Sequence, residues 1–240
     1  MYNVIKSECI KQKRTFSRKL IWVAPAVCLS ISFLLMGGGY IQTAGYNWWY
    51  ILFFPFTFTY MSAAIINREK KQNYHGLFGI CEKKEKLWYA KIGVATLYLM
   101  LTSGMFSLLS IACGFIWGEY ISIFDNILAG LVLGITFAWQ IPFFMLITLK
   151  SNMFLSIFVG VIGNLGIACI SAVESFWWIP FAIPARLMCP VIGVLPNGLV
   201  IEPGNPLEAG GVILPGLIIT ITLYVLVSVV SARIFKRQEV

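Results

Sequence analysis

Long uncharged stretches separated by short charged segments are the main pattern of this chain. Five such stretches contain no Asp, Glu, Lys or Arg. They lie between Lys19 and Arg68, Lys91 and Glu119, Asp125 and Lys150, Lys150 and Glu174, and Glu208 and Arg233. A helix needs about 20 apolar residues to cross the hydrocarbon core of a bilayer. The first stretch is therefore long enough for two crossings, and each of the others for one.

The pattern predicts six membrane-spanning helices in a single transmembrane domain over residues 1–240. The expected spans are near 20–41, 48–66, 92–117, 126–149, 153–173 and 212–232. The polar run Gln42–Asn47 is the expected break between the first two. The apolar runs are continuous and do not alternate with polar residues, which favours helices over a barrel.

Composition supports the same class. The chain is 59% hydrophobic and 12% charged, with a mean hydropathy of +0.83, whereas soluble domains carry about 25% charged residues. A soluble enzyme, a disordered chain and a disulfide-stapled secreted module are thereby disfavoured. We expect an all-α integral membrane protein.

The basic residues gather on one side of the predicted topology. Of the 18 Lys and Arg residues, all except Arg186 fall at the termini, in the segment 67–91 or at Lys150. The positive-inside rule places these segments, and both chain termini, in the cytoplasm. The positive charge is then explained by topology and by contact with anionic lipid, and no compact basic domain is present to bind nucleic acid.

The N-terminal segment 1–19 is basic, with interspersed apolar positions. Both this basic part and the apolar part that follows it are too long for a signal peptide. Two interpretations of the segment 1–19 are open. It is a cytoplasmic amphipathic helix on the inner membrane surface or a solvated basic tail.

The expected spans contain no catalytic chemistry. Their interiors hold no Asp, Glu, Lys, Arg or His, and the single histidine, His75, lies in a cytoplasmic loop. No phosphate-binding loop of the Walker type is present. The six cysteines have no metal-site spacing, and we expect neither a metal nor a disulfide. We therefore expect no enzymatic activity and no cofactor in this chain, so energy for active transport would come from another subunit.

A few residues in the spans have features of helix packing. Gly130 and Gly134 form a small-xxx-small face, and Gln140 and Asn164 are polar groups suited to hydrogen bonds between helices. Whether the glycine face packs within the chain or against another subunit stays open. The tryptophans and tyrosines near the span ends are expected as interfacial anchors. They are Trp22, Trp48, Trp49, Tyr50, Trp88, Tyr89, Trp117, Trp177 and Trp178.

The cytoplasmic loop 67–91 is longer than a simple turn requires. It carries Tyr74, Leu77, Phe78 and Ile80 between two charged flanks. An apolar patch flanked by charge suits a protein contact. The loop either docks into a cytoplasmic partner or packs these side chains on its own helices.

The external segment 174–211 contains six of the ten prolines. Proline recurs too often there for a spanning helix, and short helices that lie at the outer interface or dip into it fit better. Such a cap could contact amphipathic molecules or could serve only as an anchor.

Six spans, cytoplasmic termini and a basic first loop resemble the permease subunits of ABC-2 type exporters. In that family the loop between spans two and three begins with an acidic residue and usually ends with a lysine before span three. Glu69 and Lys91 match those places. The run Glu82–Lys86 departs from the usual Ser- or Pro-containing turn. The resemblance implies an ATPase-coupling role for Glu69, Tyr74, Leu77, Phe78 and Lys91.

The external segment Phe176–Gly198 reads F-W-W-I-P-F-A-I-P-A-R-L-M-C-P-V-I-G-V-L-P-N-G and looks like the signature of lantibiotic-immunity permeases. This resemblance implies a bacterial plasma-membrane exporter that expels lanthionine-containing peptides. The implied partners are a cytoplasmic ABC ATPase in two copies, which binds ATP and Mg, and a second identical or related permease.

The same resemblance implies a substrate-handling cap made by Trp177, Trp178, Pro180, Pro184, Arg186 and Asn197. Arg186 is expected to pair with Glu174 or Glu202 rather than to bind substrate. The alternatives are an ABC-2 permease for another amphipathic drug or lipid, and a membrane scaffold or sensor without transport.

Overall fold

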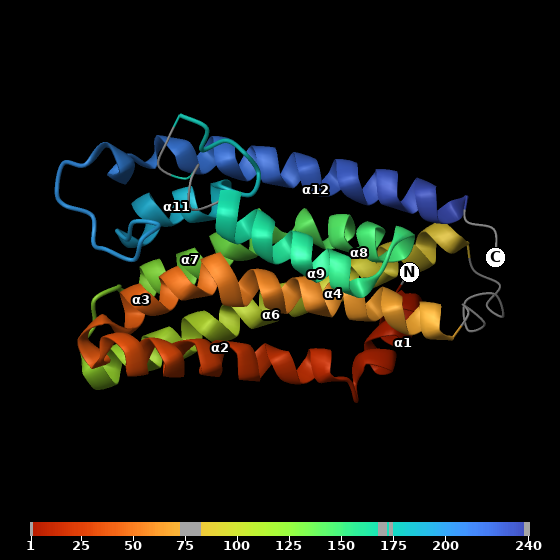
Figure 1. Cartoon of the computed structure of the whole chain (residues 1–240), viewed down its shortest axis with the longest axis horizontal. Coiled ribbons are helices and arrows are strands. Elements are labelled where there is room, and N and C mark those ends of the chain that lie inside the picture. The colour runs from red at the N-terminus through yellow and green to blue at the C-terminus, as the bar shows by residue number, and fades with distance from the viewer. Residues whose placement is uncertain (1, 73–82, 168–171, 173–174, 238–240) are drawn as a thin grey trace.

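The computed structural model describes residues 2–72, 83–167, 172 and 175–237. It is an elongated bundle of helices, with the labelled N- and C-terminal ends of the chain at the same end (Figure 1). The described residues contain only one isolated β-bridge, between Val194 and Val200, and no strand. The all-α prediction is therefore confirmed.

The described helices are named here in chain order. Their bounds are α1 Tyr2–Gln12, α2 Phe16–Met36, η1 Gly38–Tyr40, α3 Ile41–Trp48, the π-helix η2 Trp49–Phe53, α4 Phe54–Lys71, α6 Lys84–Trp117, α7 Ile123–Phe137, α8 Gln140–Lys150, α9 Met153–Ile162, the π-helix η3 Gly163–Ile167, α11 Ile183–Ile192, η4 Pro206–Glu208, η5 Gly210–Val212 and α12 Ile213–Lys236.

Five helical runs in the described part of the chain are long and apolar enough to cross a membrane. They are Phe16–Met36, Gly38–Lys71, Lys84–Trp117, Ile123–Lys150 and Gly210–Lys236. The run at the fifth expected span, Met153–Ile167, is shorter than a full crossing requires. Most of the remainder of that expected span, 168–171 and 173, lies outside the described residues, so six crossings remain a prediction.

The expected break between the first two spans is wrong in its position. Gln42–Asn47 is helical and belongs to α3, while the chain turns earlier, at Gly37–Tyr40. Gly37 ends α2 with φ +76°, a conformation that glycine adopts without strain. The amide of Gln42 is buried and donates to the Ser110 carbonyl at 3.0 Å, so a polar residue that resembled a loop is satisfied inside the bundle.

Several aromatic residues expected at the membrane interface form the core instead. Trp49, Tyr50 and Trp88 are almost completely buried. Trp49 stacks on Phe106 with ring centroids 4.4 Å apart, and the Trp88 indole donates to Ser231 at 2.9 Å. Aromatic side chains are stabilised in a packed interior by burial of their surface and by contacts between rings. Trp22, Trp117 and Trp178 are exposed, as anchors would be.

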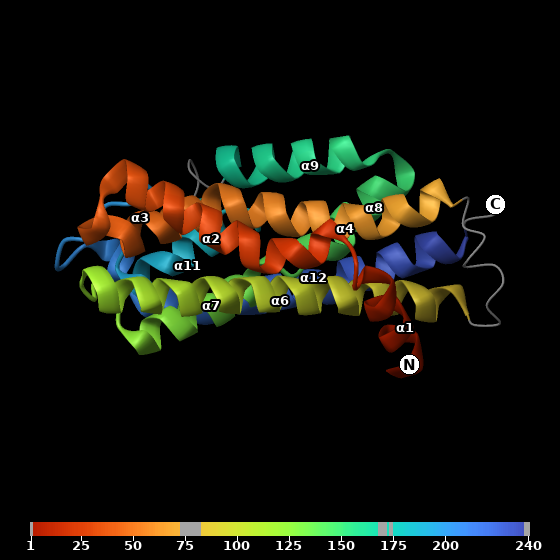
Figure 2. The same ribbon diagram turned by 90° about the horizontal axis from the view of Figure 1, so that it is seen from below.

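Helix α9 lies along one side of the bundle, next to α4 and α8 (Figure 2). Helix α11 lies at the end opposite the chain termini (Figure 1) and packs mainly against α7. This arrangement gives the bundle two chemically different ends, one with the termini and one with α11.

Candidate functional site

Four charged side chains meet at the end that carries the termini. Lys91 of α6 lies 2.7 Å from a carboxylate oxygen of Glu69 in α4 and 2.9 Å from one of Glu8 in α1. Lys11 of α1 lies 2.7 Å from Glu8 and 3.2 Å from Glu69. We call Glu8, Lys11, Glu69 and Lys91 the inner charge cluster. It joins α4 and α6 to α1, which is remote from both in sequence.

The inner charge cluster is buried except for Lys11. The side chain of Lys91 is only 1% exposed, and those of Glu8 and Glu69 are 3% and 4% exposed. Buried charges are tolerated when they are paired and hydrogen-bonded, and two lysines here face two carboxylates. Burial by itself would lower the pKa of Lys11, but Glu8 and Glu69 outweigh it and raise that pKa. Lys11 therefore carries its charge throughout the physiological pH range.

Helix α1 is fixed to α4 by a further contact. The Arg68 guanidinium donates to the carbonyl of Lys11, beside the inner charge cluster. Helix α1 also packs along α6. The N-terminal segment, expected as either a surface helix or a tail, thus contains a helix whose residues Glu8 and Gln12 face the bundle.

The inner charge cluster lies where α4 and α6 flank the segment 67–91, the loop that the sequence predicts to be cytoplasmic. Glu69 is close to the end of α4, and Lys91 is in the second turn of α6. The structure thus brings together the two residues that sequence resemblance singled out at the ends of this loop. Tyr74, Leu77 and Phe78 lie outside the described residues. Their expected coupling role stays a prediction.

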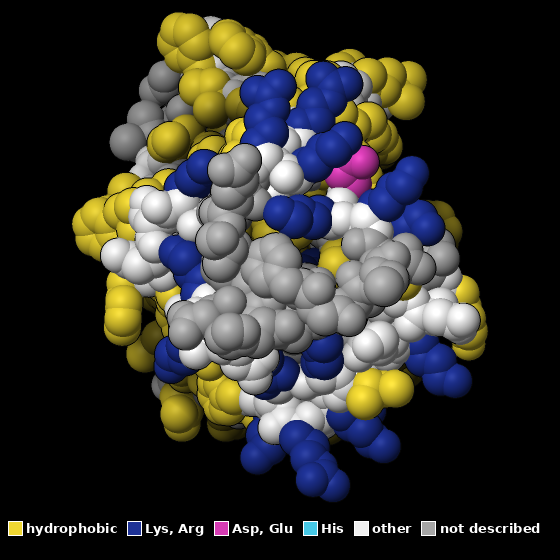
Figure 3. Space-filling view, turned by 90° about the vertical axis from the view of Figure 1, so that its right-hand side faces the viewer, with side chains coloured by type: hydrophobic (Ala, Val, Ile, Leu, Met, Phe, Trp, Pro, Cys, Tyr) yellow, Lys and Arg dark blue, Asp and Glu magenta, His cyan; other side chains and the backbone are white. Residues whose placement is uncertain are grey.

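Sequence reasoning missed the α1 members of the inner charge cluster. A signal was available, because Glu8 is the only acidic residue before Glu69. It stands one helical turn before Lys11, the spacing of neighbours on one helical face. The surrounding end of the bundle is strongly basic, with Lys and Arg side chains spread over its surface (Figure 3).

The opposite end is built around α11, which is inserted into the bundle. Almost all of its residues are buried, including Pro184 and Arg186. Gly216 of α12 permits this approach, because a Cβ there would lie 2.8 Å from Leu187. Gly193, with φ +66°, ends the helix in the left-handed conformation. Helix α11 is therefore packed inside the bundle, and its position relative to the outer interface stays a prediction.

Arg186 does not make the ion pair with Glu202 expected from sequence. In the described part of the chain its guanidinium donates instead to the backbone carbonyl of Leu207 at 2.9 Å, and no ion pair joins it to Glu202. Glu174 lies outside the described residues. A carbonyl is a sufficient partner here because η4 brings the Leu207 backbone against α11. Arg186 thus ties α11 to the following turn.

The other residues of the expected cap differ in exposure. Trp178 is 54% exposed. Phe176, which is not one of the expected cap residues, is equally exposed, and the two ring centroids lie 6.5 Å apart. Trp177 and Pro180 are partly buried, and Asn197 is exposed in a turn where it accepts from the Leu199 amide at 3.0 Å. An incoming molecule could therefore reach Trp178 and Asn197 but not Pro184 or Arg186.

The residues expected to pack the spans lie between helices. Gln140 and Asn164 exchange two hydrogen bonds, with donor–acceptor distances of 2.9 Å and 2.8 Å. Gly130 accepts from the Ser103 hydroxyl at 2.8 Å, and a Cβ on Gly134 would meet Met100 at 2.5 Å. Both glycines face α6 of the same chain. The structure thus gives an intrachain contact where the sequence left the choice open.

The chemistry available at the two ends is charge pairing and apolar contact. Among the described residues, no group of three or more His, Cys, Asp or Glu side chains could hold a metal ion. The thiols of Cys9, Cys28, Cys113 and Cys189 are free.

Comparison with known proteins gives one family match. A family model described as "ABC-2 family transporter protein" matches residues 4–166 of the chain. Those residues include the inner charge cluster and the helices from α1 to α9. Among curated proteins and solved structures, none matches the chain.

Proposed function

The chain belongs to the ABC-2 transporter family, and from this premise we propose that it expels lantibiotic-type antimicrobial peptides from a bacterial membrane. As a member it is a membrane permease component that works with an ABC ATPase. We infer that it carries no motor of its own, pairs with a second permease and receives energy from two cytoplasmic ATPase copies that bind ATP and Mg. Its termini would face the cytoplasm of the bacterial plasma membrane.

The observation that carries the coupling part of this proposal is the position of the inner charge cluster. Glu69 and Lys91 stand on the two helices that flank the cytoplasmic loop, and their 2.7 Å contact is almost fully buried. An ATPase that displaces the loop would therefore move α4 and α6 together, and α1 with them through Glu8. Paired charges in a dry site resist separation more than exposed ones do.

The substrate part of the proposal depends on the outer end. A lantibiotic is amphipathic and lodges in the outer leaflet, so its exporter needs an accessible amphipathic surface there. Trp178, Phe176 and Asn197 supply exposed aromatic and polar groups at that end. The hydrogen bond from Arg186 to the Leu207 carbonyl fixes the segment around η4 against α11. Aromatic side chains suit contact with ligands that are partly apolar and partly polar.

Co-purification tests the coupling part. The tagged chain, expressed with the genes that neighbour it, should retain an ATPase and a second permease in mild detergent. Repeated recovery of the chain without an ATPase would contradict the proposed coupling to an ATPase.

A double variant tests the substrate part. Trp177→Ala with Trp178→Ala should lower the lantibiotic concentration that cells tolerate at least severalfold and leave ATPase association unchanged. Phe124→Ala is the matched control, because Phe124 is an exposed aromatic residue at the start of α7, outside the cap. Equal loss of tolerance in both variants, or loss of the protein from the membrane, would assign the cap an anchoring role only.

Two other functions remain distinguishable by experiment. A permease for another amphipathic drug, lipid or peptide would protect cells against a different compound in a growth panel of antibiotics. A scaffold or sensor would leave ATP turnover of the reconstituted complex unchanged when peptide is added. Peptide-stimulated turnover favours the exporter.

A further inference from the structure

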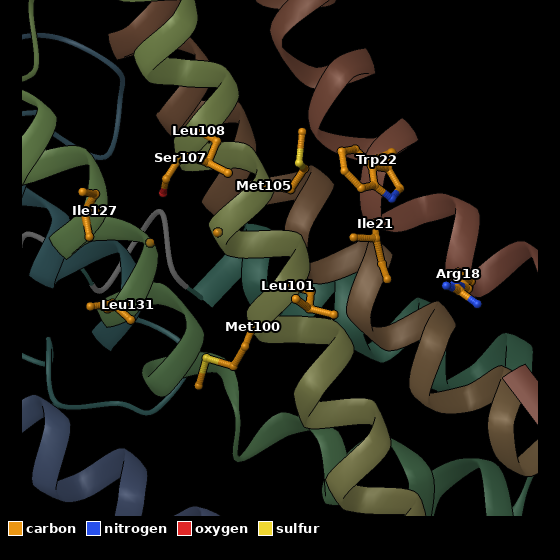
Figure 4. Close-up of a pocket in the computed structure, with 12 residues that line it drawn as sticks. Arg18, Ile21, Trp22, Met100, Leu101, Met105, Ser107, Leu108, Ile127 and Leu131 are labelled. Carbon is orange, nitrogen blue, oxygen red and sulfur yellow. The ribbon is translucent and has the colours of Figure 1, made fainter. Parts of the chain in front are cut away.

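An apolar groove opens on the side of the bundle. It has a volume of about 590 Å³ and lies between α2, α6 and α7. Met100, Leu101, Met105 and Leu108 of α6 form much of its wall, and Figure 4 shows them between the side chains of α2 and α7. The walls are almost entirely apolar, which suits a hydrocarbon chain.

The α2 side of the groove carries a single charge. Arg18 lines the groove in the first turn of α2 and is exposed. Among the described residues, no hydrogen bond or ion pair engages its guanidinium. Trp22 follows one turn later and is 62% exposed. An arginine and a tryptophan one turn apart on an exposed helical face are typical of the boundary between headgroups and hydrocarbon.

The groove lies alongside the middle of α6. Helix α6 continues from Lys91, in the inner charge cluster, to Trp117 at the other end of the bundle, and the lining segment 100–108 lies near the middle of that length. Arg18 lies near the beginning of α2, towards the basic end of the bundle. The groove therefore extends from the first turn of α2, towards the basic end of the bundle, to the middle of α6 and the first half of α7.

We propose that this groove binds an anionic phospholipid of the inner leaflet. One acyl chain lies against the α6 wall, and the phosphate accepts hydrogen bonds from Arg18, a geometry that guanidinium groups favour. Basic residues between transmembrane helices on the cytoplasmic side commonly bind such headgroups. The charge of Arg18 opposes a cationic peptide in the same place. This site is distinct from the cap and from the inner charge cluster.

Two pairs of variants distinguish the contribution of the Arg18 charge to lipid binding from that of the apolar groove. Arg18→Gln removes the phosphate partner, and Lys19→Gln is its control, an exposed neighbour that does not line the groove. Gly104→Leu fills the groove, since no atom lies within 4 Å of a Cβ built at Gly104. Gly93→Leu is the control, because Gly93 of α6 has equally open space and lies outside the groove.

The experiment is a native mass spectrometry titration of the full chain with dioleoylphosphatidylglycerol and dioleoylphosphatidylcholine. We expect retention of the anionic lipid to exceed that of the zwitterionic lipid about fivefold. Arg18→Gln should abolish this preference and Lys19→Gln should keep it. Gly104→Leu should reduce retention of both lipids, and Gly93→Leu should not.

Three results would overturn the proposal. They are an unchanged preference in Arg18→Gln, an equal loss in Lys19→Gln, and full retention in Gly104→Leu. The measurement uses neither ATPase nor peptide, so its failure is separate from failure of the proposed function.

Discussion

The two ends of the bundle, inner and outer in the proposed topology, differ in their side-chain contacts. In the described chain the inner end has a buried network of ion pairs beside side-chain bonds to backbone carbonyls from Arg68 and Lys70. At the inner end, Glu8, Lys11, Glu69 and Lys91 bind one another through side-chain charges. At the outer end, buried or partly buried side chains bind the backbone of turns. Arg186 donates to Leu207, Asn47 donates to Pro196 at 2.6 Å, and Gln42 binds the turn between α6 and α7.

This difference shows what each end is suited to do. Ion pairs between three helices fix the helices relative to one another. Displacement of one helix is therefore expected to displace the other two. Side chains bound to backbone carbonyls and amides fix the shape of individual turns. The inner end is thus suited to transmit movement, and the outer end to maintain the shape of a surface.

The strongest test of the comparison is removal of the central charge of the inner end. Lys91→Met leaves Glu8 and Glu69 buried with Lys11 as their remaining ionic partner. Breaking a buried pair in this way costs about 3–5 kcal/mol. We expect a loss of that size in the free energy of unfolding, measured by denaturant titration in mixed micelles.

Lys71→Met is the control for this variant, because Lys71 is an exposed lysine at the end of α4. A double variant with Glu69→Leu should recover part of the loss, since one of the two buried carboxylates that share Lys11 is then removed. Equal stability of Lys91→Met and the unchanged chain would contradict the view that the inner charge cluster fastens the three helices.

A smaller loss is expected when a turn at the outer end loses its side-chain partner. The Gln42 amide oxygen accepts from the backbone amides of Tyr120 and Ile121, at 2.8 Å and 2.9 Å. Gln42→Leu leaves these donors without that acceptor, at a cost of about 2 kcal/mol. The same titration measures it, with Gln72→Leu as the exposed control. A loss larger than that of Lys91→Met would reverse the proposed ranking of the two ends.

The smallest effect is expected at an exposed ion pair near the inner end. Lys236 lies 3.2 Å from Glu85, with side chains 63% and 36% exposed. Exposed pairs contribute about 0–1 kcal/mol and are screened by salt. Lys236→Gln should lower the thermal midpoint slightly at low salt and not at high salt. A loss of stability as large as that of Lys91→Met would contradict the view that buried ion pairs contribute more to stability than exposed ones.

Much of the helical architecture could be predicted from charge spacing. Five of the six expected spans correspond to long apolar helices in the described chain. Glu69 and Lys91 were recognised by their places at the ends of the loop, and the structure adds that they touch. The predicted break between the first two spans at Gln42–Asn47 is wrong. The hydrogen-bond partners that allow Gln42 to be buried in a helix, Ser110, Tyr120 and Ile121, are remote from it in sequence.

Burial of the aromatic residues and of α11 could not be read from the sequence. Trp49, Trp88 and Trp22 all lie near the ends of predicted spans. The first two are in the core, and the third is exposed. Lipid tails and a protein interior are similarly apolar. A hydrophobic residue is therefore compatible with either environment.

By itself, the sequence determined the class of protein, the approximate position of most helices and the concentration of positive charge on one side. These properties follow from the cost of placing charge and unpaired backbone in hydrocarbon, which depends on local composition. The tertiary structure alone decided that α1 supplies Glu8 and Lys11 to the inner charge cluster and that α11 enters the bundle. Both depend on distances between segments remote in sequence, which only packing of the whole chain establishes.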